Sequence, residues 1–159
     1  MIQDFAVRLP LETYISEDGR VKTIGDIYIE LDGYFFPEKN WYDFGENLLS
    51  WWTEEFTKLL NREETKVECG FMDGPVRFDL KFLKNNIWLI RCIREYSESE
   101  ECEYEAEIDS MQASKALLEA IDKMLNFLKK NEMQKSFDFI DERKQRLIRA
   151  MQKISANAR

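Results

Sequence analysis

Residues 101–109 read ECEYEAEID, and this stretch decides how the second half of the chain is interpreted. Carboxylates occupy every odd position, and smaller or apolar residues occupy the even positions. A repeat of two residues is typical of a β-strand because successive side chains leave a strand on opposite faces. The pattern therefore predicts a strand with one acidic face and one face that packs on a core. The acidic row consists of Glu101, Glu103, Glu105, Glu107 and Asp109.

The residues before this strand predict three more strands. They are expected at Thr65–Met72, Val76–Leu83 and Ile87–Tyr96, with turns at Asp73-Gly74-Pro75, Asn85-Asn86 and Ser97–Glu100. These turns set a register in which one apolar face holds Phe78, Leu80, Phe82, Leu89, Ile93, Tyr104, Ala106 and Ile108. The opposite face then carries the acidic row with Arg77, Asp79, Lys81, Trp88, Ile90, Cys92 and Arg94. Arg94 lies opposite Glu103 in this register.

The N-terminal half predicts more strands and one helix. Strands are expected at 7–16, 21–24 and 27–31, with turns at 17–20 and 32–33, and a helix is expected at 43–62. Residues 34–37 are expected to lead into a loop, because Pro37 blocks a ladder. Asp43 is a candidate N-cap for this helix, with Glu46 as its capping-box partner. In the adjacent pair Trp51-Trp52, only one indole can face the core, since neighbouring side chains on a helix diverge.

The C-terminal residues predict two helices, with a break near Asn131. The expected fold class is α+β, an antiparallel sheet of about six to seven strands with helices packed on one face. The expected order is β-β-β-α-β-β-β-β-α-α, in a single domain over residues 1–159 with the C-terminal helices from about residue 110. The apolar stripe of the last helix predicts either packing within the chain, as a monomer, or a helix-mediated homodimer.

The composition of the chain limits which partners, catalytic groups and metal sites are expected. The net charge is −8, and it is uneven, since residues 133–159 carry +4 and residues 1–132 carry −12. An acidic chain argues against nucleic acid as a partner and favours a basic protein. The absence of histidine removes the usual general base and the commonest zinc ligand. The odd set Cys69, Cys92 and Cys102 matches no metal or redox spacing and predicts free thiols, although Cys92 and Cys102 are able to bridge adjacent strands. No cofactor, metal or membrane span is expected, and the chain is expected in the cytoplasm.

The candidate partner-binding residues are the acidic row and Trp88. The plainer interpretation is a solvated strand face that pairs with Arg77, Lys81 and Arg94. A second hypothesis is a small-ligand-binding or regulatory domain, with a pocket between helix and sheet lined by Trp41, Trp51, Trp52 and Trp88. A carboxylate-based hydrolase is a third hypothesis, for which Glu30, Asp32, Asp43, Asp73 and Asp79 offer acids but no evident pair. The leading expectation is therefore a binding protein and not an enzyme.

Three segments carry a resemblance to known proteins. Residues 31–44 (LDGYFFPEKNWYDF), 48–52 (LLSWW) and 71–75 (FMDGP) resemble a pattern found in small, mostly uncharacterised bacterial proteins on the immunity side of polymorphic toxin systems. The resemblance covers roughly residues 27–96 and carries no functional residues. It implies a small acidic cytoplasmic α+β protein that binds and blocks one cognate toxin, most naturally a basic nuclease, by steric and electrostatic means.

Overall fold

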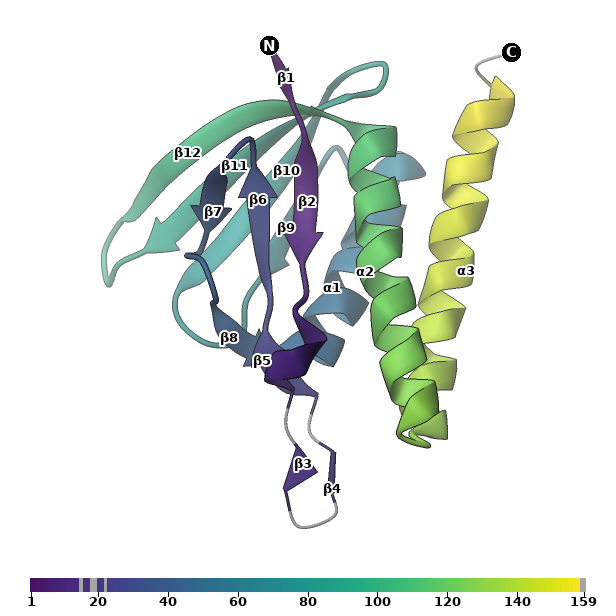
Figure 1. The fold of residues 1–159 in the computed structure, drawn as a ribbon. Helices are drawn as coiled ribbons and strands as arrows, with labels where there is room; N and C mark the ends of the chain where they lie inside the picture. Colours follow the sequence, from purple (N-terminus) through teal and green to yellow (C-terminus); the bar gives the residue numbers. More distant parts are fainter. Residues whose placement is uncertain (15, 18–19, 22, 158–159) are drawn as a thin grey trace.

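The computed structural model describes residues 1–14, 16–17, 20–21 and 23–157. Its main layer is a five-stranded sheet with the order β1-β12-β11-β10-β9 (Figure 1). These strands are β1 (Ile2–Gln3), β9 (Lys66–Gly70), β10 (Val76–Lys84), β11 (Ile87–Glu95) and β12 (Glu100–Asp109). The sheet is mixed, because β1 runs parallel to β12 while the other neighbours are antiparallel. The α+β class is confirmed, but the expected single antiparallel sheet of six to seven strands is not.

Smaller sheets are built from the N-terminal residues. A three-stranded sheet joins β2 (Phe5–Arg8), β6 (Tyr28–Leu31) and β7 (Tyr34–Phe36), and it lies in front of the large sheet in Figure 1. Two short pairs are β3 (Ser16–Glu17) with β4 (Arg20–Val21), and β5 (Ile24–Asp26) with β8 (Tyr42–Phe44).

Two expected boundaries in this region are wrong. The expected strand at 7–16 ends at Arg8, because Pro10 cannot donate to a ladder and leads instead into the 3-10 turn η1 (Leu11–Thr13). Residues 34–37, expected only to lead into a loop, contain strand β7. The turn expected at 17–20 includes residues 18 and 19, which lie outside the described residues.

Three helices pack beside one another. They are α1 (Gly45–Leu60), α2 (Ser110–Lys130) and α3 (Gln134–Asn157), and α3 lies against both α1 and α2 (Figure 1). Asn131 caps α2, which confirms the expected break. Ile140, Leu147 and Met151 of the last helix are buried within the chain, while the other members of its apolar stripe, Phe137, Ile148 and Ile154, are half-buried. None of the helices in the described part of the chain combines the length and apolar content needed to cross a lipid bilayer.

An aromatic core joins α1 to the large sheet. Trp52 packs edge to face on Phe71 and Phe78, with ring centroids 5.1 and 5.2 Å away, and its indole nitrogen donates to the carbonyl of Gly70 at 2.8 Å. Phe56 packs in the same way on Trp88, at 5.4 Å. Trp51 is 42% exposed, which confirms that only one of the adjacent indoles faces the core. These rings pack against one another between helix and sheet, and among the described residues no Trp side chain lines the two cavities discussed below.

A bulge changes the predicted register of the sheet. Phe82 pairs with Trp88 and Lys84 pairs with Ile87, so Leu83 is an extra residue in β10. The bulge turns β11 over relative to the prediction, and its core-facing residues are Trp88, Ile90 and Cys92. Leu89 and Ile93 consequently lie on the opposite face, where Leu89 is half-buried and Ile93 is fully buried, and the assignment of Trp88 to that face is wrong. β10 and the second half of β12 keep the predicted faces.

Asp43 is a buried structural carboxylate and not a helix cap. Helix α1 begins at Gly45, after Phe44 as the N-cap residue, and Asp43 is fully buried in β8. Its carboxylate accepts hydrogen bonds from the indole nitrogen of Trp41 at 3.0 Å, from the backbone N–H of Phe44 at 2.7 Å and from that of Asp73 at 3.0 Å. It therefore ties together two of the segments that carry the resemblance.

Candidate partner-binding surface

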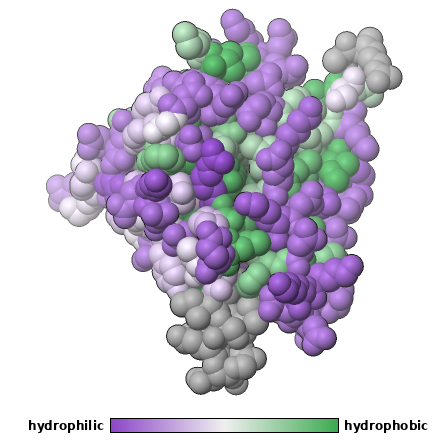
Figure 2. Space-filling model, viewed as in Figure 1, coloured by the Kyte–Doolittle hydropathy of each residue, from purple (hydrophilic) through white to green (hydrophobic). Residues whose placement is uncertain are grey.

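The hairpin of β11 and β12 projects beyond the rest of the molecule (Figure 1). Its turn is closed by a hydrogen bond from the backbone N–H of Tyr96 to the carbonyl of Ser99, at 2.7 Å. Every residue from Glu95 to Glu101 is exposed. In Figure 2 the side of the molecule where this hairpin projects is coloured mainly for hydrophilic residues. We define residues 95–105 as the acidic hairpin.

A second bulge divides the acidic row. Tyr104 pairs with Cys92 while Cys102 pairs with Ile93, so Glu103 is an extra residue in β12. A bulge reverses the alternation of faces along the strand, and Glu101 consequently lies opposite Arg94. The expectation that all five acids share one face is therefore wrong. Glu101 and Glu103 lie on the side that faces the small sheet, and Glu105 and Glu107 lie on the outer face.

Aromatic residues support the acids on the side of the small sheet. The Tyr34 ring stacks on Tyr104 at a centroid distance of 4.1 Å, and its hydroxyl donates to Glu103 at 3.4 Å. Burial, together with the neighbouring Cys92 and Glu103, raises the pKa of Tyr34, so its hydroxyl stays protonated as a donor. Glu103 also forms an ion pair with Arg94, the cation expected opposite it. Tyr96 donates through its hydroxyl to Glu101 at 3.3 Å.

A guanidinium anchors the outer side of the hairpin. Arg77 bonds to Asp79 at 2.8 Å and to Glu100 at 2.9 Å, and it also pairs with Glu95. Burial disfavours its charged form, but its hydrogen bonds to Asp79, Glu100 and Glu95 outweigh burial and raise the pKa of Arg77. Asp79 is only 2% exposed and also meets Lys66 at 3.6 Å. This network fixes both strands at the start of the projecting turn.

The remaining candidate residues have different roles. Glu105 is exposed and pairs with Arg91 at 3.4 Å, while Glu107 is half-buried beside β1. Asp109 is the N-cap of α2 and accepts from the backbone N–H of Gln112 at 2.8 Å, so its carboxylate is already used within the chain. Trp88 is 2% exposed and cannot contact a partner. The structure thus removes Trp88 from the candidate surface and assigns Asp109 a capping role.

The sequence-based site missed the tip of the hairpin. Tyr96 is 54% exposed and bonds to the exposed Glu101, with the exposed Glu98 in the same turn, while Glu95 and Glu100 are exposed on the other side of the hairpin, where they bind Arg77. The sequence signal for this tip is an aromatic residue, Tyr96, followed by a turn with repeated acids at residues 97–100. Exposed aromatic residues within a charged rim are common anchors at protein interfaces.

Comparisons with protein-family models, with curated proteins and with solved structures find no match for this chain. Among the described residues, no group of three or more Cys, Asp and Glu side chains is placed to hold a metal ion. The three cysteines are free thiols. The candidate surface therefore has to be interpreted from its own geometry and charge.

Proposed function

We propose that this chain is an immunity-type protein that binds a cationic toxin and neutralises it by covering it, with the acidic hairpin as the contact surface. The observation that carries the proposal is the projecting tip, where the exposed Tyr96 bonds to the exposed Glu101, with the exposed Glu98 in the same turn. Such a tip offers one aromatic anchor and a negative rim to a positively charged surface. The proposed action is steric and electrostatic and includes no catalytic step.

Preorganisation supports this choice of surface. The ion pairs of Arg77 with Glu95 and Glu100, and of Arg94 with Glu103, hold the hairpin in one shape before a partner arrives. A rigid surface loses less conformational entropy on binding. The carboxylates outnumber these two cations, so the tip keeps a negative charge that would steer a basic protein toward it. The free thiols agree with the cytoplasmic location that we include in the proposal.

The proposal is tested with the products of neighbouring genes, purified singly and titrated onto this protein by calorimetry and biolayer interferometry. We expect one basic protein to bind and to lose its toxicity on co-expression. The double variant Glu98→Lys/Glu101→Lys should slow association by about tenfold or more and weaken the salt dependence of the association rate. Tyr96→Ala should mainly speed dissociation.

The matched control is Glu38→Lys/Glu119→Lys, which makes the same change in net charge at exposed positions outside the hairpin. This control should associate at close to the wild-type rate. Equal slowing by both double variants would mean that overall charge alone guides the encounter, and the hairpin would lose its assigned role. If none of the basic neighbouring products binds, the immunity proposal fails.

A further inference from the structure

A groove between α1 and α3 gathers cations on a chain that is otherwise acidic. Its volume is about 220 Å³. The cations in its wall are Lys58, Arg143, Arg146, Arg149 and Lys153. Two carboxylates, Glu54 and Glu63, also line it, so the wall carries a net charge of about +3. Lys58 pairs with Glu55 at 3.2 Å and Arg146 pairs with Glu142, while the salt bridges of the described residues include none from Arg143, Arg149 or Lys153.

Arg143 is the most informative of these cations. Its guanidinium carbon lies 3.7 Å from the centre of the Phe139 ring, a stacked arrangement that fixes the plane of the group. Its Nε is buried and has no hydrogen-bond partner among the described residues. Arg143 lines the groove, and the stacked ring holds its guanidinium there as a fixed donor of hydrogen bonds. Phosphate oxygens match the fork of an arginine well.

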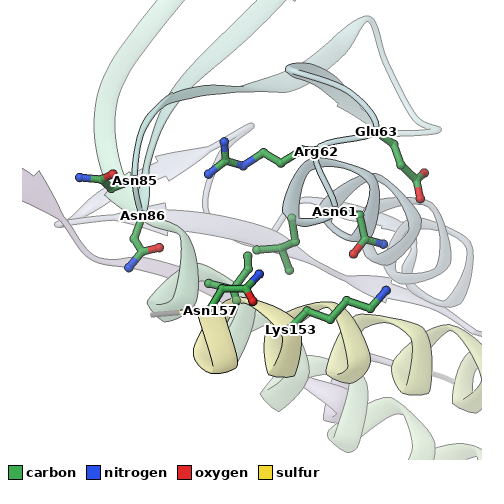
Figure 3. A pocket seen from close by; sticks show the side chains of 9 residues that line it. Asn61, Arg62, Glu63, Asn85, Asn86, Lys153 and Asn157 are labelled. Carbon is green, nitrogen blue, oxygen red and sulfur yellow. The ribbon is translucent and has the colours of Figure 1, made fainter. Parts of the chain in front are cut away.

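A second cavity of about 790 Å³ adjoins the groove and shares Asn61, Glu63 and Lys153 with it. Figure 3 shows that side chains from the end of α1, from the β10–β11 turn and from α3 surround this cavity. Its lining is rich in amides, namely Asn61, Asn85, Asn86 and Asn157. Amides offer both donors and acceptors, which suits hydroxyl groups.

The electrostatics of the two cavities differ. The second cavity lies at the C-terminal end of α1, where a helix carries a partial negative charge. Arg62, Glu63 and Lys153 nevertheless give its lining a net charge of about +1, below the +3 of the groove, so the groove is the stronger site for a phosphate and the amides of the second cavity suit hydroxyl groups. Glu54 and Glu63 likewise limit the groove to a small number of anionic charges. The overall charge of −8 also disfavours a long polyanion such as nucleic acid.

We propose that these two cavities together bind a phosphomonoester of a small polyhydroxylated molecule, of the sugar phosphate class. The phosphate lies in the groove against Arg143, Arg149 and Lys153, and the hydroxyl groups contact the amides of the adjoining cavity. This site is separate from the acidic hairpin and does not depend on the proposed function. It also gives the basic last helix a purpose beyond packing.

The test is calorimetry on the full chain at low ionic strength and near-neutral pH, with ribose 5-phosphate, inorganic phosphate and ribose as probes. We expect ribose 5-phosphate to bind most tightly, phosphate more weakly and ribose not at all. Arg143→Gln and Arg149→Gln should each weaken binding of ribose 5-phosphate by about tenfold, the loss of one charge-assisted contact. In NMR spectra, the Nε–H signal of Arg143 should shift on addition of the ligand.

The matched control is Arg91→Gln, which removes the same charge from the outer face of the large sheet, where Arg91 pairs with Glu105. This variant should bind ribose 5-phosphate like the wild type. Absence of binding by both phosphate compounds, or equal weakening by Arg91→Gln, overturns the proposal. Equal affinities for phosphate and ribose 5-phosphate overturn the part that concerns hydroxyl groups. If the Arg143→Gln variant fails to fold, the Arg149→Gln variant decides the outcome, because Arg149 is exposed and its replacement should not disturb the fold.

Discussion

Asp43 and the acidic hairpin show two opposite uses of the same functional group. Asp43 is fully buried and accepts three hydrogen bonds, each from a donor in the protein. The hairpin carries more carboxylates, but they are exposed and meet cations that are themselves partly in water. A buried acceptor with several donors contributes to stability in a way that exposed ion pairs do not. The position of a carboxylate, and not the number of acids, therefore decides its effect on the fold.

The largest expected effect follows from removing the buried carboxylate. Asp43→Ala leaves the N–H groups of Trp41, Phe44 and Asp73 without their acceptor and should lower the free energy of unfolding by about 4 kcal/mol. Asp43→Asn keeps one acceptor oxygen and should cost less. Urea unfolding followed by tryptophan fluorescence measures both, with Glu98→Ala as the exposed control. A loss below about 1 kcal/mol for Asp43→Ala would remove the contrast between the two regions.

The second prediction concerns the free energy of unfolding at alkaline pH. It depends on Tyr14, whose pKa is raised by burial and in part by Asp43. Burial, followed by the carboxylates of Asp26 and Asp43, raises the pKa of Tyr14 far above its usual value. An unfolded tyrosine loses its proton near pH 10, while the folded one keeps it, so the unfolded state binds fewer protons. The free energy of unfolding should therefore fall above about pH 10, by up to about 1.4 kcal/mol per pH unit from this group.

The measurement is a series of urea unfolding curves between neutral and strongly alkaline pH. Tyr14→Phe removes the titrating group and should flatten the decline. A decline that is the same in the wild type and in Tyr14→Phe would place its origin elsewhere.

Two members of the acidic row, Asp109 and Glu107, allow a bonded carboxylate to be compared with one on the same strand that has no hydrogen bond among the described residues. Asp109 caps α2, so Asp109→Ala should cost about 1 kcal/mol of stability. Glu107→Ala, two residues earlier on the same strand, should change stability by less than about 0.5 kcal/mol. Thermal unfolding by calorimetry distinguishes these values. Equal losses for the two variants would show that strand charge, and not capping, governs this end of β12.

The smallest expected effect is at the tip of the hairpin. Glu98→Lys/Glu101→Lys should leave the free energy of unfolding within about 0.5 kcal/mol of the wild type, because exposed charges are screened by water. Urea unfolding under the conditions used for Asp43→Ala allows a direct comparison. A loss above about 1 kcal/mol would mean that the tip stabilises the fold and does not serve only as a surface.

The sequence predicted the second half of the fold better than the first. The order from β9 to α3, the turn at Asn85-Asn86 and the helix break at Asn131 are as expected. These features depend on local periodicity and turn chemistry, which are visible along the chain. β1 and β12 are far apart in the sequence, and a strand of two residues is too short to show an alternating pattern.

Two of the errors in the candidate site, the face of Trp88 and the continuity of the acidic row, have one physical cause. A bulge inserts a residue without changing the hydrophobic pattern around it, so the alternation looks continuous in the sequence. The bulge at Leu83 moved Trp88 into the core, and the bulge at Glu103 divided the acidic row. Asp43 was misassigned for a different reason, because a cap and a buried acceptor both favour aspartate before a helix. Only the tertiary structure distinguishes these alternatives.

The parallel pairing of β1 with β12 has a consequence during folding. β1 and β12 are about a hundred residues apart in the chain, and contacts between such distant segments form late in folding, so β12 is an open edge of the sheet until β1 docks. Open edges invite other chains to add strands, and repeated charge on an edge discourages this. Glu105 and Glu107 would then protect the chain from aggregation until β1 docks. The double variant Glu105→Gln/Glu107→Gln should aggregate more than the wild type during refolding, as measured by light scattering. These two residues of the acidic row would then act before the protein is folded.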